Sequence, residues 1–180
     1  MRSLVLLVLL DIACGTFAAE VESRQLTHYI PQDVLEAAVR KEDWTEIPLE
    51  VKGGVRKGDV VRIWAGGLID RGNGDQPGKN VNGPAGDERA QPTDEKNAFV
   101  LSAEATHQYA LLVKTESTGP TKCLPSGKPL EIKLTKDKEK LLLGFNDEKG
   151  HYQDNHLGKG KRHELDPLWV RIEVIRMTVD

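Results

Sequence analysis

The most constraining feature of this sequence is a series of short apolar runs that glycine and proline interrupt. Runs of this length, rich in Val, Ile, Leu and aromatic residues and bounded by turn residues, are typical of β-strands. The 180 residues include 17 Gly and 9 Pro, a content that favours many turns over long helices. We therefore predict strands at 47–51, 59–65, 98–101, 109–113, 130–134, 141–145 and 169–179.

Strands of this kind indicate an all-β fold, a β-sandwich in which two sheets enclose the core. In the last run the apolar phase switches after Val174, so we expect a bulge or a change of partner sheet there. Trp44, Trp64 and Trp169 are expected to pack in the core or between the sheets. One short helix is predicted over Asp33–Val39, with Asp33 as its N-cap.

Composition narrows the function classes. Charged residues make up 29% and apolar residues 38% of the chain, which excludes a membrane bundle and wholesale disorder. The formal net charge is -3, so no global positive field attracts nucleic acid or anionic lipid, and we expect neither partner. A homo-oligomer is compatible with the sequence.

The first 19 residues have the layout of a signal peptide: Arg2, the apolar run Leu4–Leu10, and small residues at the end. The run is shorter than the roughly 20 residues that span a bilayer, which makes an uncleaved anchor the weaker interpretation. Asp11 disfavours lipidation at Cys14. We expect a secreted or periplasmic protein whose mature chain keeps Cys123 and therefore has no intramolecular disulfide.

Three regions follow from these patterns: the signal peptide at 1–19, an N-terminal extension with the short helix at 20–43, and the β-sandwich at 44–180. Within the sandwich, residues 66–97 are rich in Gly, Asp and Asn and almost free of apolar side chains. Loops of this length without a packed core of their own are usually functional or disordered.

A second polar stretch, residues 145–158, follows an apolar run and is dominated by oxygen-bearing side chains. Asp147, Asp154 and Asn155 are ligand types that a hard cation such as Ca²⁺ prefers, and Gly150 allows a sharp turn between them. Their spacing does not match an EF-hand. Asp and Asn also gather in ordinary turns, so the residues alone leave a plain turn open.

These segments resemble the small calcium-dependent galactose-binding lectins of bacteria (LecA type). Phe145-Asn146-Asp147, Gly150-His151-Tyr152 and Asp154-Asn155 are similar to the calcium and sugar loop of that family. The strand and glycine turn at 58–67 and the Gly-Pro-Ala-Gly-Asp at 83–87 are similar to earlier family segments. The resemblance implies a jelly-roll-like β-sandwich in which Ca²⁺ bridges the protein and two sugar hydroxyls.

The resemblance also implies a ligand set. The Ca²⁺ ligands would be the side chains of Asp147, Asp154 and Asn155 and the carbonyls of Arg71 and His151. The sugar would contact Asp147, Glu148, His151, Asp154, Gln91 and Asp94. Asp154 stands where the family has Asn and cannot donate a hydrogen bond to a sugar, so galactose specificity does not carry over.

The leading hypothesis is therefore an exported, non-enzymatic, calcium-dependent carbohydrate-binding domain. The alternative is a structural or protein-interaction sandwich with a structural or vacant calcium site. A zinc site of His151, His156 and His163 lacks a compact ligand spacing, and Cys123 is more simply an inert thiol than a nucleophile. A hydrolase that uses Asp147 and Asp154 as its carboxylate pair is the weakest interpretation.

Overall fold

The computed structural model describes residues 21–72, 81–87, 107–116, 120–147, 149–157 and 166–179, with the backbone alone at 21–25 and 177–179. Several predictions concern other residues. The signal peptide, the strand at 98–101 and much of the glycine-rich loop lie outside the described residues, as do Gln91, Asp94, Glu148 and His163.

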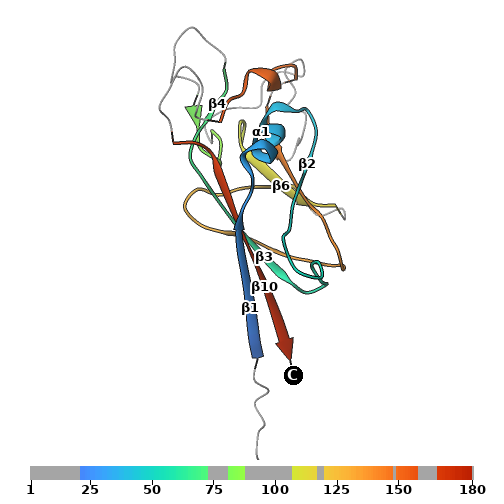
Figure 1. The fold of residues 1–180 in the computed structure, drawn as a ribbon. Coiled ribbons are helices and arrows are strands. Elements are labelled where there is room, and N and C mark those ends of the chain that lie inside the picture. Colours follow the sequence, from blue (N-terminus) through green and yellow to red (C-terminus); the bar gives the residue numbers. More distant parts are fainter. Residues whose placement is uncertain are drawn as a thin grey trace, which may run out of the picture.

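Two four-stranded antiparallel sheets form the body of the molecule (Figure 1). The first sheet has the order β1 (Val21–Tyr29), β10 (Trp169–Val179), β3 (Val60–Gly66) and β8 (Leu130–Lys133). The second has the order β2 (Thr45–Ile47), β9 (Leu141–Phe145), β6 (Leu111–Thr115) and β7 (Lys122–Cys123). The all-β sandwich is confirmed, whereas the jelly-roll form stays a prediction.

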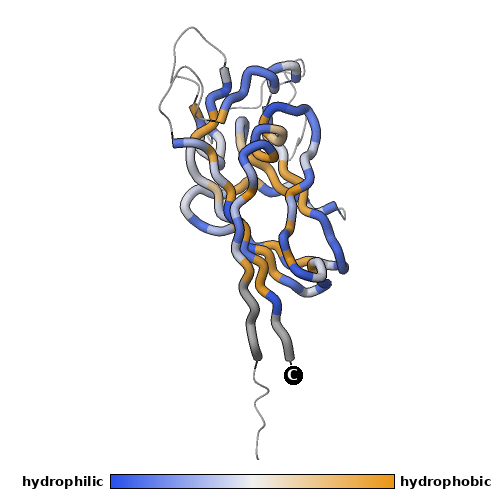
Figure 2. Tube along the Cα trace, viewed as in Figure 1, coloured by the Kyte–Doolittle hydropathy of each residue, from blue (hydrophilic) through white to orange (hydrophobic). Residues whose placement is uncertain are grey.

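The core lies between the two sheets. On β3, Val61, Ile63 and Ala65 are buried while the residues between them are partly exposed, as a strand with one inward face requires. Leu141, Leu143 and Phe145 of β9 face them from the second sheet and are fully buried. Figure 2 shows the apolar segments concentrated along these strands and the polar ones along the turns.

The predicted helix is confirmed as α1 (Gln32–Arg40). It begins after Pro31, and Asp33 lies in its first turn, so the prediction of Asp33 as N-cap is wrong. A proline is tolerated where the first helical N–H groups have no intrahelical partner, and its fixed φ suits the helix start. Leu35, Ala38 and Val39 form its buried face. Within the described part of the chain, no helix is both long and apolar enough to cross a membrane.

The N-terminal extension contains a strand that the sequence analysis missed. β1 pairs with β10 over its whole length, from Val21 opposite Val179 to Tyr29 opposite Arg171. It is an edge strand of mixed polar sequence, so it lacks the apolar alternation that reveals a half-buried strand. Residues 21–43 thus contribute both an edge strand and α1 to the sandwich.

No bulge interrupts β10, contrary to expectation, because its register with β1 is continuous. Its pairing with β3 ends at Ile175, so beyond that point β10 pairs with β1 alone. Side-chain alternation places Arg176 on the inner face after Val170, Ile172 and Val174. Arg176 donates hydrogen bonds to Asp59 Oδ1 and Oδ2 at 3.1 and 2.7 Å. The switch in apolar phase therefore marks an ion pair on the inner face.

The three tryptophans do not enter the core, which corrects a second expectation. Lys114 Nζ lies 4.2 Å from the ring centroid of Trp44, and the Arg171 guanidinium lies 4.1 Å from that of Trp64. Trp169 is 39% exposed and meets Tyr29 edge to face. Each amphipathic ring thus covers an outer surface, where a cation or a second ring packs on it.

Candidate calcium and carbohydrate site

Two segments far apart in the sequence meet at the end of the sandwich opposite the C-terminus (Figure 1). One is the short strand β4 (Ile69–Asp70), which pairs with β5 (Val81–Asn82). The other is the stretch 146–156, called the acidic loop below. Asp70 and His156 exchange both backbone hydrogen bonds, at 2.9 and 2.8 Å between nitrogen and oxygen. The structure thus brings together the two segments that the sequence analysis places around one ion.

The turn after β4 packs directly on the acidic loop. The Asp70 carboxylate accepts a hydrogen bond from the Gly72 N–H at 3.0 Å, which closes the turn around Arg71. Gly72 has φ +73°, and a Cβ at this position would lie 2.4 Å from the Asp154 carbonyl oxygen. Glycine is required here both by the left-handed backbone and by the close approach.

Replacing Gly72 is therefore expected to force the two segments apart. We predict that Gly72→Ala lowers the free energy of unfolding by about 2–3 kcal/mol, from left-handed backbone strain and the clash with Asp154 together. Gly127→Ala is the matched control, because Gly127 has the same φ of +73° and nothing within 4 Å of an added Cβ. In urea unfolding, Gly127→Ala should lower the free energy of unfolding by only about 1 kcal/mol. Equal costs for the two variants would show that the contact between the segments is unimportant.

Asp147 and Asn155 form the buried centre of the acidic loop, with exposed fractions of 2% and 0%. Asn155 Nδ2 donates to Asp147 Oδ2 at 2.8 Å and to the Val39 carbonyl at the same distance. The Tyr152 hydroxyl lies between the backbone N–H and carbonyl of Asp147, at 3.3 and 3.2 Å. Burial raises the pKa of this hydroxyl, so Tyr152 stays protonated and donates to the carbonyl.

Three side-chain oxygens in this loop are buried and have no hydrogen-bond partner: Asn146 Oδ1, Asp154 Oδ1 and Asn155 Oδ1. Unsatisfied buried oxygens are uncommon in folded proteins and call for an explanation such as an ion. Carboxylate and amide oxygens are the ligands that Ca²⁺ takes. The chemistry of these oxygens fits a calcium ion: two of the three predicted side-chain ligands, Asp154 and Asn155, carry them, and the third, Asp147, contacts Asn155 through Oδ2.

The two predicted carbonyl ligands come from the two segments that meet. Arg71 follows β4, and its guanidinium stacks on the Tyr109 ring at 3.6 Å from the centroid. Tyr109 has φ +57°, an uncommon value for a residue with a Cβ, and its N–H donates to the Asn146 carbonyl at 2.7 Å. His151 directly precedes the 3₁₀ turn η2 (Tyr152–Asp154). Both residues are half-buried at the same end of the sandwich.

The other metal and nucleophile candidates gain no support. Across the described ranges, no three His, Cys, Asp or Glu side chains gather as a metal-binding group. The predicted calcium ligands would not form such a group, because they include only two carboxylates, together with one side-chain amide and two backbone carbonyls. Burial raises the pKa of the Cys123 thiol, although a hydrogen bond from the backbone of His107 opposes this. A raised pKa reduces the thiolate fraction and hence the reactivity of Cys123.

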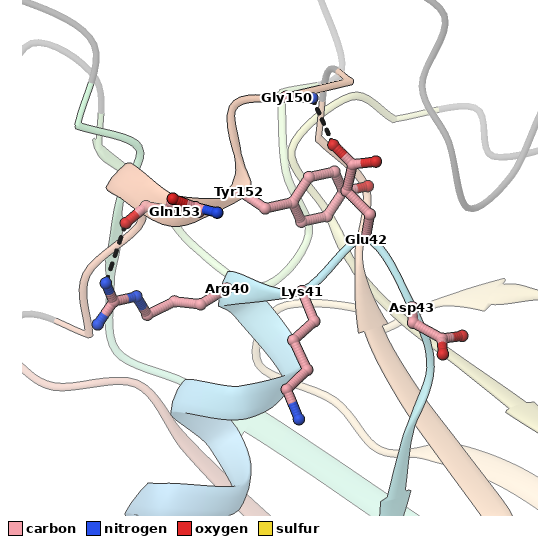
Figure 3. A pocket seen from close by; sticks show the side chains of 7 residues that line it. All are labelled: Arg40, Lys41, Glu42, Asp43, Gly150, Tyr152 and Gln153. Carbon is pink, nitrogen blue, oxygen red and sulfur yellow. Dashed lines mark hydrogen bonds between the residues drawn. The ribbon is translucent and has the colours of Figure 1, made fainter.

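A pocket of about 380 Å³ lies between the end of α1 and the acidic loop (Figure 3). Its lining does not include Asp147, Asp154 or Asn155, so it is separate from the candidate ion ligands. The lining residues are Arg40, Lys41, Glu42, Asp43, Gly150, Tyr152 and Gln153.

Several residues that shape the site were not predicted from the sequence. Asp70 could have been found, because Asp two residues before Gly is a typical turn signal. Asn146 lies in the quoted motif but was given no role there. Tyr109 has no comparable signal, since its contact with the Asn146 carbonyl joins residues that flank β6 and β9. Arg40 at the end of α1 and Glu42 just after it reach the acidic loop, more than 100 positions away, and no local pattern predicts that contact.

Neither the family models nor the curated proteins compared with this sequence give a match. The lectin resemblance therefore rests on the quoted motifs and stays a prediction.

Proposed function

We propose that this protein binds Ca²⁺ between the β4 turn and the acidic loop and, through the ion, a carbohydrate. The observation that carries the proposal is the backbone pairing of Asp70 with His156, which joins the two segments beside oxygens that lack a hydrogen-bond partner. The Asp147 and Asp154 carboxylates would neutralise the ion, and Asn155 and the carbonyls of Arg71 and His151 would complete the protein ligands. A bound Ca²⁺ supplies coordination positions for neutral sugar hydroxyls, which hydrogen bonds alone hold weakly in water.

The test is a titration in two stages. The mature chain, freed of metal by a chelator, is titrated with Ca²⁺ in a calorimeter and then with a panel of monosaccharides and oligosaccharides. We expect heat from Ca²⁺ with a stoichiometry of one, and heat from at least one sugar in Ca²⁺ but none in chelator. Absence of a Ca²⁺ signal would refute the proposal.

The deep burial of Asp147 and Asn155 favours a second candidate, a purely structural ion that ties the two segments together. An ion enclosed by protein ligands has no coordination positions left for a sugar. Its signature would be a melting temperature that Ca²⁺ raises, because a ligand of the folded state stabilises it, with no response to any glycan. This is the non-catalytic structural or protein-interaction alternative.

A further inference from the structure

The end of α1 and the turn that follows it contact the acidic loop at three points, through residues that we call the helix clasp: Val39, Arg40 and Glu42. The Val39 carbonyl accepts from Asn155 Nδ2 at 2.8 Å. Arg40 Nη2 donates to the Gln153 carbonyl at 3.1 Å, and Glu42 accepts from the Gly150 N–H. Figure 3 shows Arg40 and Glu42 reaching separate parts of the loop on either side of Tyr152.

The helix that carries the clasp is held independently of the acidic loop. Leu35, Ala38 and Val39 are fully buried in the main core. Just before the helix, the Ile30 N–H donates to the Val170 carbonyl of β10 at 2.9 Å. Gln32 Nε2 donates to the Leu168 carbonyl at 3.0 Å. The sandwich thus anchors the helix that carries Val39 and Arg40, and Glu42 follows two residues after its end.

The clasp also determines how the Asn155 amide is oriented. A primary amide has two N–H donors and one carbonyl oxygen. Both donors are in use, one toward Val39 and one toward Asp147. The remaining polar atom, Oδ1, is the buried oxygen without a hydrogen-bond partner. The Val39 carbonyl therefore helps to set which end of the amide is available to an ion.

We propose that α1 is a positioning element for the ion site: its clasp orders residues 150–155 before an ion binds. A loop that is already ordered loses less conformational freedom on binding, so the affinity for the ion is higher. Groups that orient metal ligands from outside the coordination shell typically contribute 10–100-fold in affinity. Arg40 and Glu42 are positioning residues, since the contacts described above join them to the loop backbone. The affinity part of this inference rests on the proposed function, whereas the ordering of the loop does not.

The test compares Arg40→Ala and Glu42→Ala with two matched variants. Glu42→Gln keeps an acceptor oxygen for the Gly150 N–H and should behave as the wild type. Lys41→Ala removes an exposed side chain from the same turn and serves as the neutral control.

The first measurement is hydrogen exchange without calcium, read at the Asn155 and His156 amides. These donate to the Tyr152 and Asp70 carbonyls rather than to the clasp itself, so they report whether the loop as a whole stays in place. We expect exchange about tenfold faster in Arg40→Ala and Glu42→Ala, because each removes a side chain that is hydrogen-bonded to the loop backbone. Unchanged exchange in both variants would overturn the inference.

The second measurement is the dissociation constant for Ca²⁺ by calorimetry. We expect it to rise by about tenfold in Arg40→Ala and Glu42→Ala, and to stay at the wild-type value in Glu42→Gln and Lys41→Ala. If the wild type binds Ca²⁺ and all variants bind it equally, the clasp has no positioning role while the proposed function stands. If the wild type binds no Ca²⁺, the proposed function fails, and faster exchange in the alanine variants still supports the clasp.

Discussion

Asp147→Asn is expected to abolish calcium binding while the fold survives. The substitution keeps the size of the side chain and an oxygen that can accept from Asn155 Nδ2, but it removes one of the two carboxylate charges that would neutralise the ion. Loss of a direct ligand should exceed the 10–100-fold typical of supporting residues, so we expect an affinity decrease of more than about a hundredfold. Calorimetric titration with Ca²⁺ measures it, and every calcium-dependent glycan signal should disappear with it.

Asp43→Asn provides the matched control for this experiment. Asp43 is an exposed carboxylate close to the acidic loop, and its Oδ1 accepts from the neighbouring Trp44 N–H at 2.7 Å. The change of charge is the same, so a general electrostatic effect would weaken calcium binding in both variants. If Asp147→Asn binds Ca²⁺ with the wild-type affinity, Asp147 is not a calcium ligand.

Arg176→Ala is expected to cause the largest loss of stability. The Asp59 side chain of this ion pair is 4% exposed and that of Arg176 16%, and Arg176 also donates to the Gly54 carbonyl at 2.9 Å. Removing Arg176 leaves a buried carboxylate without its cation, for which the typical cost is 3–5 kcal/mol. We expect the free energy of unfolding in urea to fall by about 3 kcal/mol.

Lys140→Ala is the control at an exposed pair. Lys140 forms an ion pair with Glu46 at 2.8 Å, with side chains that are 47% and 55% exposed. Exposed pairs contribute about 0–1 kcal/mol, so this variant should unfold close to the wild type. A similar loss in both variants would contradict the assignment of Arg176 as a buried anchor.

The same ion pair predicts a dependence on pH. Burial by itself raises the pKa of the Asp59 carboxyl, but the hydrogen bonds from Arg176 and from the Arg56 N–H outweigh it and leave the pKa below its ordinary value. A lowered pKa in the folded state means that the stabilisation is complete above the ordinary carboxyl pKa and is lost as the pH falls through the folded-state pKa. Urea unfolding at pH 7 and pH 3 should show a larger decrease for the wild type than for Asp59→Asn.

Much of the fold could be predicted because apolar alternation and turn residues are local signals. The runs at 130–134, 141–145 and 169–179 match β8, β9 and β10 within a residue. The run at 47–51 fails because the strand ends at Ile47, before Pro48, which has no N–H for a sheet. β1 and the ion pair of Arg176 depend on partners far along the chain, and no local pattern contains them.

The candidate site was predictable where one loop supplies its residues. Asp147 and Asn155 are eight positions apart, and they are in direct contact. The resemblance, and not the spacing, implied that the turn at Arg71 lies near the acidic loop, because no local pattern joins segments with several strands between them. The structure places Gly72 of that turn against Asp154. The support from α1 could not be predicted, since Glu42 looks like any exposed acidic residue after a helix.

Anomalous diffraction from a calcium-soaked crystal would locate the ion itself. We expect a single anomalous peak about 2.4 Å from oxygens of Asp147, Asp154 and Asn155 and from the Arg71 and His151 carbonyls, with at least one coordination position open to solvent. A peak at any other place, or none at saturating Ca²⁺, would contradict the proposed calcium site.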